Sequence, residues 1–313
     1  MTYLLKMGRR LPSLAIAATV LALVGPLATV AAAAPSNEPA TPARTASSRS
    51  LWPLERAHAH NDYEHARPLF DALDHGFTSV EADVWLQDGE LRVAHDESAT
   101  QPGRTLQSLY LDPLRQRVRT EHGSVYAGWH GSVQLLIDVK SDGPATYAAV
   151  DRVLRQYPDL MTRWTGGREH MRPVTAVISG NRDREAMTAQ TTRYAGYDGR
   201  LSDLGTGTPA SFMPLVSDNW TQQFTWLGVG PMPSAEREKL HRIVAQSHAA
   251  GYTLRFWATP DLATSARESL WRESVAAGVD YLNTDDLAGL ESFLRTQDPQ
   301  ESRAQGRPLH AAA

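Results

Sequence analysis

The chain has 313 residues, with 31 lysines and arginines against 35 aspartates and glutamates, 42% hydrophobic residues and no cysteine. The slightly negative net charge argues against a nucleic-acid-binding protein, which needs a basic surface to neutralise phosphates. The absence of cysteine excludes a disulfide framework, a zinc–thiolate site and a thiol nucleophile.

The N-terminal segment has the layout of a secretory signal peptide. Lys6, Arg9 and Arg10 precede an uncharged stretch, Leu11 to Ala34, that ends in small residues. We therefore predict that residues 1–34 are a cleaved signal peptide rather than a membrane anchor, and that the protein is secreted. Cleavage would remove three basic residues and no acidic ones. We therefore expect no stable membrane insertion of the mature chain and no nucleic-acid partner.

Two further segments are poor in apolar residues and rich in small and polar ones. Residues 35–50 are expected to form a flexible leader, and residues 295–313 a disordered tail. One folded domain, residues 51–294, remains between them. The sequence makes no prediction of the oligomeric state.

Short β-like runs alternate with helix-like runs through this domain, which is typical of βα units around a parallel sheet. Strands are expected at residues 54–60, 79–85, 90–95, 133–139, 174–179, 213–217, 225–229, 253–257 and 281–284. Helices are expected at residues 68–75, 145–157, 183–194, 234–250, 262–277 and 287–294. About eight parallel strands, without a glycine-rich phosphate turn after the first, favour an α/β fold of the (β/α)8 TIM-barrel type over an open doubly wound sheet.

Polar side chains stand near the ends of the first two expected strands. His58 and His60 are two residues apart and share one face of the first strand, with Asn61 at the turn that follows. Glu81 and Asp83 share one face of the second strand. Because buried charge must be paired or bound to a cation, these carboxylates indicate more than a simple core.

Later strands add to this group. His95 ends the third expected strand, and Asp138 and Lys140 end the fourth. Three neighbouring carboxylates repel one another, and a hard divalent cation such as Mg²⁺ or Ca²⁺ relieves the repulsion through oxygen ligands. Imidazoles beside such an ion are suited to general acid and base catalysis. The sequence therefore predicts one divalent cation held by Glu81, Asp83 and Asp138.

At these residues the sequence resembles the superfamily of glycerophosphodiester phosphodiesterases and phosphatidylinositol-specific phospholipases C. The order of His, E-x-D, His, D-x-K and a final GVDYLNTDD covers nearly the whole domain. The motifs HAHNDY, RPLFDAL and SVEADVW resemble the branch named for altered inheritance of mitochondria protein 6. The D-x-K strand is also similar to that of sphingomyelinase D enzymes. The resemblance implies a TIM-barrel phosphoric diester hydrolase that acts on glycerophosphodiesters or phospholipid head groups.

The resemblance also implies roles for individual residues. His95 would be one catalytic histidine, and His60, or alternatively His58, the other. Lys140 would contact a phosphate oxygen, with Asn61 and Trp257 as further substrate-binding residues. The chain has HNDY where the superfamily has His-Arg-Gly, so the phosphate-binding arginine is missing, and Arg67 is a candidate substitute.

Two other functions fit parts of the pattern. HAH at the end of a first barrel strand also opens the amidohydrolase signature, a zinc hydrolase that would need further histidines such as His170, His241 or His248. The second is a barrel that binds a phosphorylated head group without catalysis. Zinc content separates the first from a Mg²⁺ or Ca²⁺ enzyme, and turnover of a phosphodiester excludes the second.

Overall fold

The computed structural model describes residues 52–297, which fall within one compact unit. The predicted signal peptide (1–34) and leader (35–50) lie outside the described residues, as does residue 298 onward of the predicted tail. The last helix, α8 (Leu287–Gln297), extends three residues beyond the predicted end of the domain.

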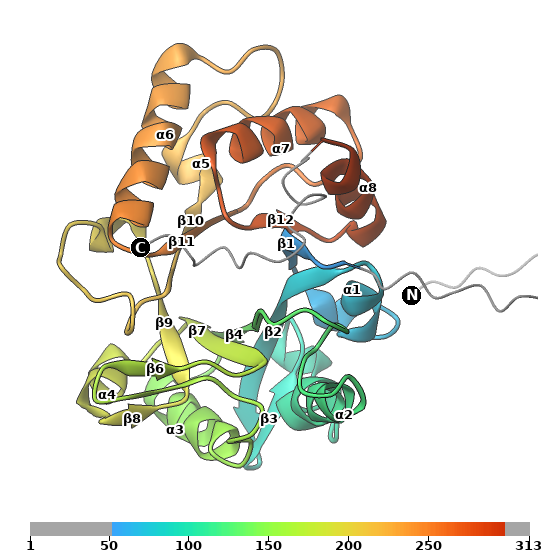
Figure 1. The fold of residues 1–313 in the computed structure, drawn as a ribbon, viewed down its shortest axis with the longest axis vertical. Helices are drawn as coiled ribbons and strands as arrows, with labels where there is room; N and C mark the ends of the chain where they lie inside the picture. Colours follow the sequence, from blue (N-terminus) through green and yellow to red (C-terminus); the bar gives the residue numbers. More distant parts are fainter. Residues whose placement is uncertain (1–51, 298–313) are drawn as a thin grey trace, which may run out of the picture. The chain divides into compact units, whose positions relative to one another are not determined.

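Eight parallel strands build the core of the fold (Figure 1). They are β1 (Leu54–Ala59), β2 (Phe77–Gln87), β4 (Val133–Val139), β7 (Val174–Gly180), β9 (Ala195–Gly199), β10 (Leu215–Asn219), β11 (Thr253–Trp257) and β12 (Leu282–Thr284). From β1 to β11 each strand pairs with the next of the eight in chain order, and β12 pairs with β1. A parallel bridge between Arg255 and Tyr281 links β11 to the segment that enters β12. The strands thus form a nearly closed barrel, which confirms the predicted TIM-barrel class.

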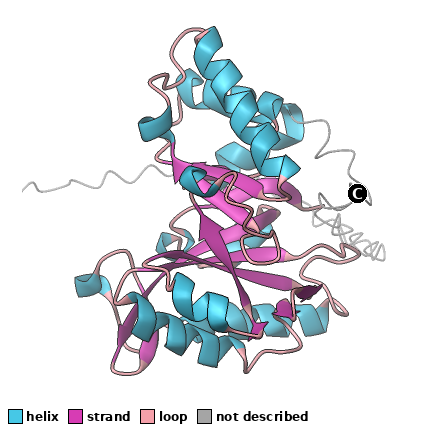
Figure 2. Cartoon of the chain, turned by 90° about the vertical axis from the view of Figure 1, so that its left-hand side faces the viewer, coloured by secondary structure: helices cyan, strands magenta, loops and turns pink. Residues whose placement is uncertain are grey.

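Helices lie outside the strands (Figure 2). They are α1 (Phe70–Asp74), α2 (Asp112–Thr120), α3 (Gly143–Leu154), α4 (Arg184–Ala189), α5 (Trp220–Gln223), α6 (Ser234–Ala249), α7 (Ser265–Ala277) and α8. The hairpin strand β3 (Glu90–Val93) pairs antiparallel with β2, and a small separate sheet contains β5 (Arg163–Thr165), β6 (Arg168–His170) and β8 (Thr192–Arg193). Among the described helices, none has the length and apolar character needed to cross a membrane.

The barrel interior changes from apolar to polar along the strands. Leu136 in β4, Val177 in β7 and Leu215 in β10 form a small buried cluster. Asp138 and Ser179 come two residues after Leu136 and Val177, and therefore point to the same side of their strands. The polar layer lies at the C-terminal ends of the strands, where TIM-barrel enzymes hold their sites.

One expected strand, residues 225–229, is a loop in the structure. The backbone N–H groups of Thr225 and Trp226 donate to the carboxylate of Glu236, each at 3.0 Å, instead of to a neighbouring strand. Gly228, with φ +89°, has a backbone conformation that does not continue a strand. The apolar run WLGV therefore belongs to a loop that is held by the first turn of α6.

Conversely, β9 was not predicted, because its sequence AGYDG contains two glycines, which are poor strand formers. Both glycines allow close packing in the fold. A Cβ on Gly196 would lie 2.4 Å from Pro214, and one on Gly199 would lie 2.3 Å from Met213. The fifth barrel strand thus forms through tertiary packing, although its local propensity opposes it.

A pair of glycine substitutions tests how tightly the loop at 225–229 is packed. A Cβ on Gly228 would lie 2.0 Å from the backbone oxygen of Ala266, whereas one on Gly230 meets nothing within 4 Å. Both residues have positive φ, so both alanine variants bear that strain. We expect Gly228→Ala to lower the free energy of unfolding by roughly 1–3 kcal/mol more than Gly230→Ala in urea denaturation. Equal losses would contradict this packing.

Candidate active site

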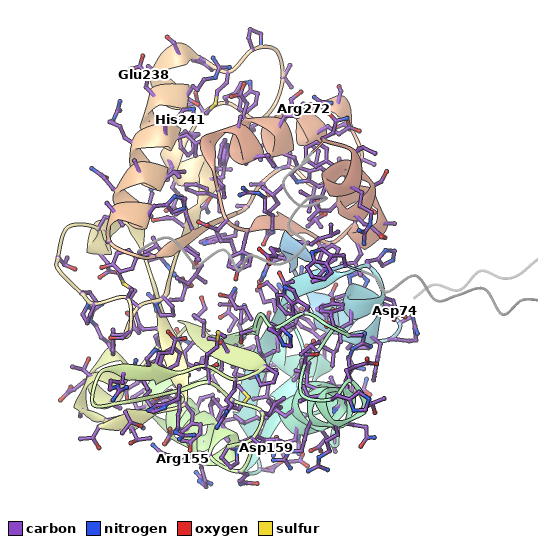
Figure 3. All side chains as sticks on the ribbon, in the orientation of Figure 1. Asp74, Arg155, Asp159, Glu238, His241 and Arg272 are labelled. Carbon is purple, nitrogen blue, oxygen red and sulfur yellow. The ribbon has the colours of Figure 1, made fainter. Side chains whose placement is uncertain are left out.

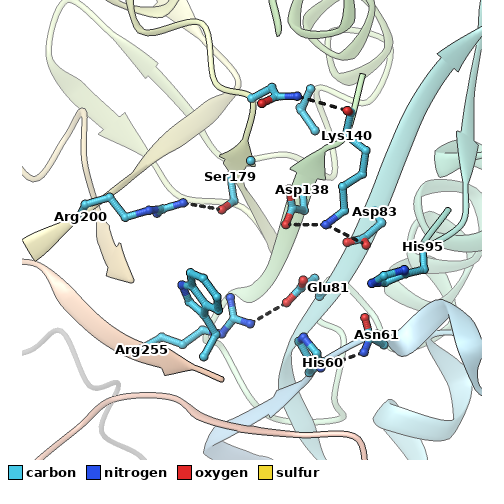
Figure 4. Close-up of a pocket in the computed structure, with 14 residues that line it drawn as sticks. His60, Asn61, Glu81, Asp83, His95, Asp138, Lys140, Ser179, Arg200 and Arg255 are labelled. Carbon is cyan, nitrogen blue, oxygen red and sulfur yellow. Dashed lines mark hydrogen bonds and ion pairs between the residues drawn. The ribbon is translucent and has the colours of Figure 1, made fainter. Parts of the chain in front are cut away.

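A cavity of about 380 Å³ opens at the C-terminal ends of the barrel strands (Figure 4). The residues that line it are His60, Asn61, Glu81, Asp83, His95, Asp138, Val139, Lys140, Ser179, Gly180, Asn181, Arg200, Arg255 and Trp257. The structure therefore brings together eight of the nine site residues expected from the sequence. The ninth, His58, is not among the lining residues.

Three carboxylates form the centre of this cavity. Glu81 and Asp83 come from β2, and Asp138 comes from β4, in register with Asp83. One ligand oxygen from each lies within 4.8 Å of the others. Asp83 Oδ1 and Asp138 Oδ1 are buried and have no hydrogen-bond partner. Oxygen atoms in this arrangement match the ligand preference of a divalent cation such as Mg²⁺ or Ca²⁺.

The pKa values of these three carboxylates are shifted in different directions. Burial opposes the charge of Glu81, but Arg255 and His58 outweigh it and hold the pKa of Glu81 well below its usual value. Burial and the charge of Glu81 raise the pKa of Asp83 to about 7, against the opposing effect of Lys140. Burial also raises the pKa of Asp138. A bound divalent cation would stabilise the charged forms of Asp83 and Asp138, which burial and the charge of Glu81 disfavour.

Two basic side chains lie against the carboxylates. Lys140 Nζ is 3.0 Å from Asp83 Oδ2 and 3.1 Å from Asp138 Oδ2. Arg255 Nη2 is 2.7 Å from Glu81 Oε2, and Arg255 is buried. Together they place a positive charge against each of the three carboxylates.

Gly180 makes room for Asp138. With φ +67°, it adopts a conformation that L side chains rarely take, and a Cβ there would lie 2.0 Å from Asp138 Oδ1 and 2.4 Å from Val139 O. Only glycine fits at this point, because any side chain would displace the carboxylate from its place in the cluster.

A chain of polar contacts links the cluster to His60. The hydroxyl of Tyr63 lies 2.7 Å from both Asp83 Oδ2 and Asn61 Oδ1. Because a hydroxyl donor faces Oδ1, the amide nitrogen of Asn61 points to His60 Nδ1, at 2.9 Å, and to Asp285 Oδ1, at 3.3 Å. His60 Nδ1 is itself 2.8 Å from Asp285 Oδ1. Tyr63 and Asn61 of the HNDY motif thus connect Asp83 with His60 and Asp285.

The two histidines of the cavity differ in environment. Burial opposes protonation of His60, but the hydrogen bond with Asp285 and the charge of Glu81 outweigh it and raise the pKa of His60. Since Nδ1 is engaged with Asp285, Nε2 is the nitrogen suited to proton exchange with a ligand. His95 follows β3, and its side chain is 57% exposed, with Nδ1 3.4 Å from Asp96. Despite these different environments, both imidazoles line the same cavity.

His58, the alternative first histidine, has a different position. Its side chain is 0% exposed, with Nδ1 2.7 Å from Ser79 Oγ and Nε2 3.1 Å from Glu81 Oε2. Burial and the charge of Arg255 lower its pKa to about 3, so the ring is neutral at neutral pH. His58 therefore holds Glu81 in place and does not reach a ligand in the cavity.

Sequence reasoning missed two arginines of the cavity. Arg67, the candidate substitute for the missing arginine, is exposed and pairs with Asp71 and Asp74 on the surface. Arg255 and Arg200 line the cavity instead. The signal for Arg255 was a charge in the middle of the apolar strand TLRFW, but Arg200 follows the unpredicted strand β9 and had no comparable signal.

The amidohydrolase interpretation lacks its later histidines. His170 is in the exposed strand β6, and His241 and His248 are in α6, where His248 bonds to Asp280. None of the three is among the residues that line the cavity. The E-x-D strand, which that interpretation left unexplained, contributes two of the three clustered carboxylates.

Comparison with known proteins identifies the family. A model described as the AIM6-like phosphodiesterase domain matches residues 45–198, and one of the glycerophosphoryl diester phosphodiesterase family matches residues 253–288. Altered inheritance of mitochondria protein 6 of Eremothecium gossypii is 32% identical over 279 residues, which cover 78% of this chain and 71% of that protein. The chain belongs to the AIM6-like phosphodiesterase family.

Two further AIM6 relatives agree with this membership. The AIM6 homologue of Arthroderma benhamiae is 28% identical over 78% of this chain and 85% of that protein. The Saccharomyces cerevisiae protein is 27% identical over 80% of this chain and 77% of that protein. A crystal structure of a glycerophosphoryl diester phosphodiesterase from Parabacteroides distasonis matches 78% of this chain and 87% of that chain, with 12% identity and a TM-score of 0.46.

The AIM6-like relatives contradict the predicted secretion. Their names connect them with the inheritance of mitochondria, and not with export from the cell. The prediction of an extracellular location was therefore wrong. It rested on the composition of residues 1–34 alone. A pattern of basic residues followed by an apolar stretch does not reliably distinguish a secretory signal peptide from other N-terminal segments.

Asp62 of the HNDY motif has a structural role that pH should reveal. Its Oδ2 accepts a hydrogen bond of 2.6 Å from the backbone N–H of Leu69, a residue with φ +66°. Burial raises the pKa of Asp62 to about 7, against the opposing effect of this bond.

The folded state therefore keeps the Asp62 proton at pH values where the unfolded state has lost it. Stability from this group is fully present below about pH 4 and falls as pH rises to about 7, at up to about 1.4 kcal/mol per pH unit. Asp62→Asn keeps the acceptor but cannot ionise, so we expect a smaller loss of unfolding free energy between pH 5 and pH 7 than in the wild type. The unfolding free energies come from denaturant titrations at pH 5 and pH 7. An equal loss in Asp62→Asn and in the wild type would contradict this role.

Proposed function

We propose that this protein is a metal-dependent phosphoric diester hydrolase that acts on glycerophosphodiesters or phospholipid head groups. One observation carries the proposal: three crowded carboxylates, two of them with buried oxygens that have no partner, stand between two histidines and two basic side chains in one cavity. Membership of a phosphodiesterase family supports the same reaction class.

Glu81, Asp83 and Asp138 would hold one divalent cation, Mg²⁺ or Ca²⁺. When bound, such an ion stabilises the negative charge that develops on the phosphoryl oxygens. Lys140 and Arg255 add positive charge beside it and orient the diester. His58 and Tyr63 keep two of the carboxylates in place, because they bond to Glu81 and Asp83 respectively.

His60 and His95 would transfer the protons. One takes the proton of the nucleophilic hydroxyl, which belongs either to water or to the substrate itself. As the new P–O bond forms, the P–O bond to the leaving alcohol breaks, and the other histidine donates a proton to the leaving oxygen. Asp285 holds His60 by Nδ1, and Asn61 donates to the same oxygen of Asp285, so the proton would pass through Nε2.

Removal of one carboxylate tests the cation site. In calorimetric titrations with MgCl₂, CaCl₂ and MnCl₂, we expect one divalent ion to bind the wild type. In thermal unfolding, the same ion should raise the melting temperature. Asp138→Asn removes a ligand and part of the repulsion, so it should weaken binding about tenfold or more while the metal-free protein remains folded.

Asp159→Asn is the matched control for this experiment, since Asp159 is an exposed aspartate that pairs with Arg115 and Arg119 away from the cavity (Figure 3). This control should bind the ion like the wild type. Cation binding that is equally strong in Asp138→Asn would overturn the assignment of the site.

Histidine variants test the chemistry. We expect His60→Ala and His95→Ala each to lower phosphodiester hydrolysis about 10²–10⁴-fold, because each removes a proton-transfer group. Turnover of bis-p-nitrophenyl phosphate with and without chelator measures the effect, and circular dichroism checks the fold.

The control is His241→Ala, which removes an exposed histidine on the outer helix α6 and should retain wild-type turnover (Figure 3). Phosphodiester binding without turnover in the wild-type protein would instead identify a head-group-binding barrel. Wild-type rates in both site variants would refute the proposed roles of His60 and His95.

A further inference from the structure

The carboxylate that holds His60 belongs to a turn, and not to a strand. Asp285 follows β12 and precedes α8, and its side chain is 52% exposed. An exposed side chain on a turn can hold an imidazole in one direction only if the turn itself is fixed. The backbone N–H of His60 also donates to Thr284 O, at 3.0 Å, because β1 and β12 are neighbours in the barrel (Figure 1). Both the backbone and the imidazole of His60 therefore depend on residues 284–286.

Asp261 fixes this turn from the loop that connects β11 to α7. Its Oδ1 accepts a hydrogen bond of 2.6 Å from Thr284 Oγ1, and its Oδ2 accepts one of 2.6 Å from the backbone N–H of Asp285. Thr284 Oγ1 in turn accepts from the backbone N–H of Asp286, at 2.9 Å. One carboxylate thus restrains three consecutive residues of the turn.

A buried arginine holds Asp261 and the turn together. Arg267 Nη1 donates to the backbone oxygen of Asp261, at 2.9 Å, and Nη2 lies 2.9 Å from Asp286 Oδ2. Asp286 Oδ1 accepts from the backbone N–H of Gly289 in the first turn of α8, at 3.0 Å. The loop and the turn are therefore joined by one network, in which Asp261 is the group that bonds to Asp285.

We propose that Asp261 is a positioning residue for His60; this rests on the proposed function. It acts through Asp285: by fixing the backbone of the turn, it keeps Asp285 Oδ1 2.8 Å from His60 Nδ1 and leaves Nε2 for proton exchange with the diester. Asp261 is not among the residues that line the cavity, so it does not contact the diester itself. Its loss should therefore slow the reaction of a bound diester without weakening the binding.

Removal of the carboxylate tests this role. We expect Asp261→Ala to lower kcat on bis-p-nitrophenyl phosphate about tenfold, with KM within about twofold of the wild-type value, because the diester is bound but the imidazole is misplaced. Asp261→Asn should recover most of the lost kcat, since its amide oxygen can accept from the Asp285 N–H and its amide nitrogen can donate to Thr284 Oγ1. A contribution to stability alone would not divide kcat from KM in this way.

Glu236→Ala is the matched control. The carboxylate of Glu236 also accepts a threonine hydroxyl, that of Thr225 at 2.6 Å, and the backbone N–H groups of Thr225 and Trp226, each at 3.0 Å. It holds a loop of the same barrel, but neither Glu236 nor its partners line the cavity. We expect a loss of unfolding free energy in urea similar to that of Asp261→Ala, with wild-type kcat and KM.

A double-mutant cycle tests the route through Asp285. Asp285→Ala removes the carboxylate that holds His60, so in that background Asp261→Ala should lower kcat further by less than about threefold. The full loss in both backgrounds would mean that Asp261 acts by another route, and would overturn the inference. If Asp261→Ala does not fold, Thr284→Val removes the hydroxyl bonded to Asp261 Oδ1 without a change of charge, and should also lower kcat at constant KM.

The orientation of the ring can be observed by NMR of protein labelled with ¹⁵N-histidine, in which His60→Ala identifies the signals of His60. In the wild type we expect the neutral ring to carry its proton on Nδ1, facing Asp285. Asp261→Ala should move part of the population to the tautomer with the proton on Nε2, whereas Glu236→Ala should not.

The outcomes separate this inference from the proposed function. Wild-type kcat in folded Asp261→Ala would overturn the inference and leave the hydrolase standing. A wild type that turned over no phosphodiester would refute the hydrolase. The NMR spectra would then decide the inference without turnover, because an unchanged His60 tautomer in Asp261→Ala would overturn it and a changed one would support it.

Discussion

The crowding of three carboxylates at the mouth of the barrel is the constraint on which the rest of the site depends. Glu81 and Asp83 belong to one strand and Asp138 to the next, so the parallel register forces their charges together. Burial makes that arrangement unfavourable, as the raised pKa values of Asp83 and Asp138 show. The surrounding structure therefore supplies Lys140 and Arg255 as counter-charges, and the carboxylates themselves could hold a divalent cation.

The same constraint explains why so many neighbours are polar. Glu81 is bonded by His58 and Arg255, and Asp83 by Tyr63 and Lys140. These groups fix the carboxylates in the positions that a cation requires, at the cost of removing polar side chains from water.

Tyr63 connects this requirement to the histidine side of the cavity. Its hydroxyl lies 2.7 Å from Asn61 Oδ1, and the amide nitrogen of Asn61 donates to Asp285 Oδ1. The same Asp285 oxygen bonds to His60 Nδ1. The HNDY motif therefore serves as internal scaffolding for the site, and the arginines that line the cavity come from the far half of the barrel, after β9 and within β11.

Much of this was predictable from sequence, because the relevant signals are local. Apolar runs such as VQLLIDV identify strands buried on both faces, and E-x-D places two charges on one face of such a run. The expected clustering of Glu81, Asp83 and Asp138 followed from the rule that parallel strands end at the same edge. The loop at 225–229 was mispredicted because Glu236, a residue outside that run, binds its backbone N–H groups. The strand β9 was missed because its glycines pack against Pro214 and Met213, which lie outside the strand.

By itself, the sequence determined the barrel class and the group of carboxylates and histidines, since both depend on the order and spacing of residues along single strands. Only the tertiary structure decided that His60, and not His58, borders the cavity, because His58 lies within β1, where neighbouring strands bury it, and His60 follows the end of that strand. It also decided that Arg255 meets Glu81 and that Arg200 lines the same cavity. The place of Arg255 depends on closure of the barrel, which brings residues more than 100 positions apart into hydrogen-bond contact.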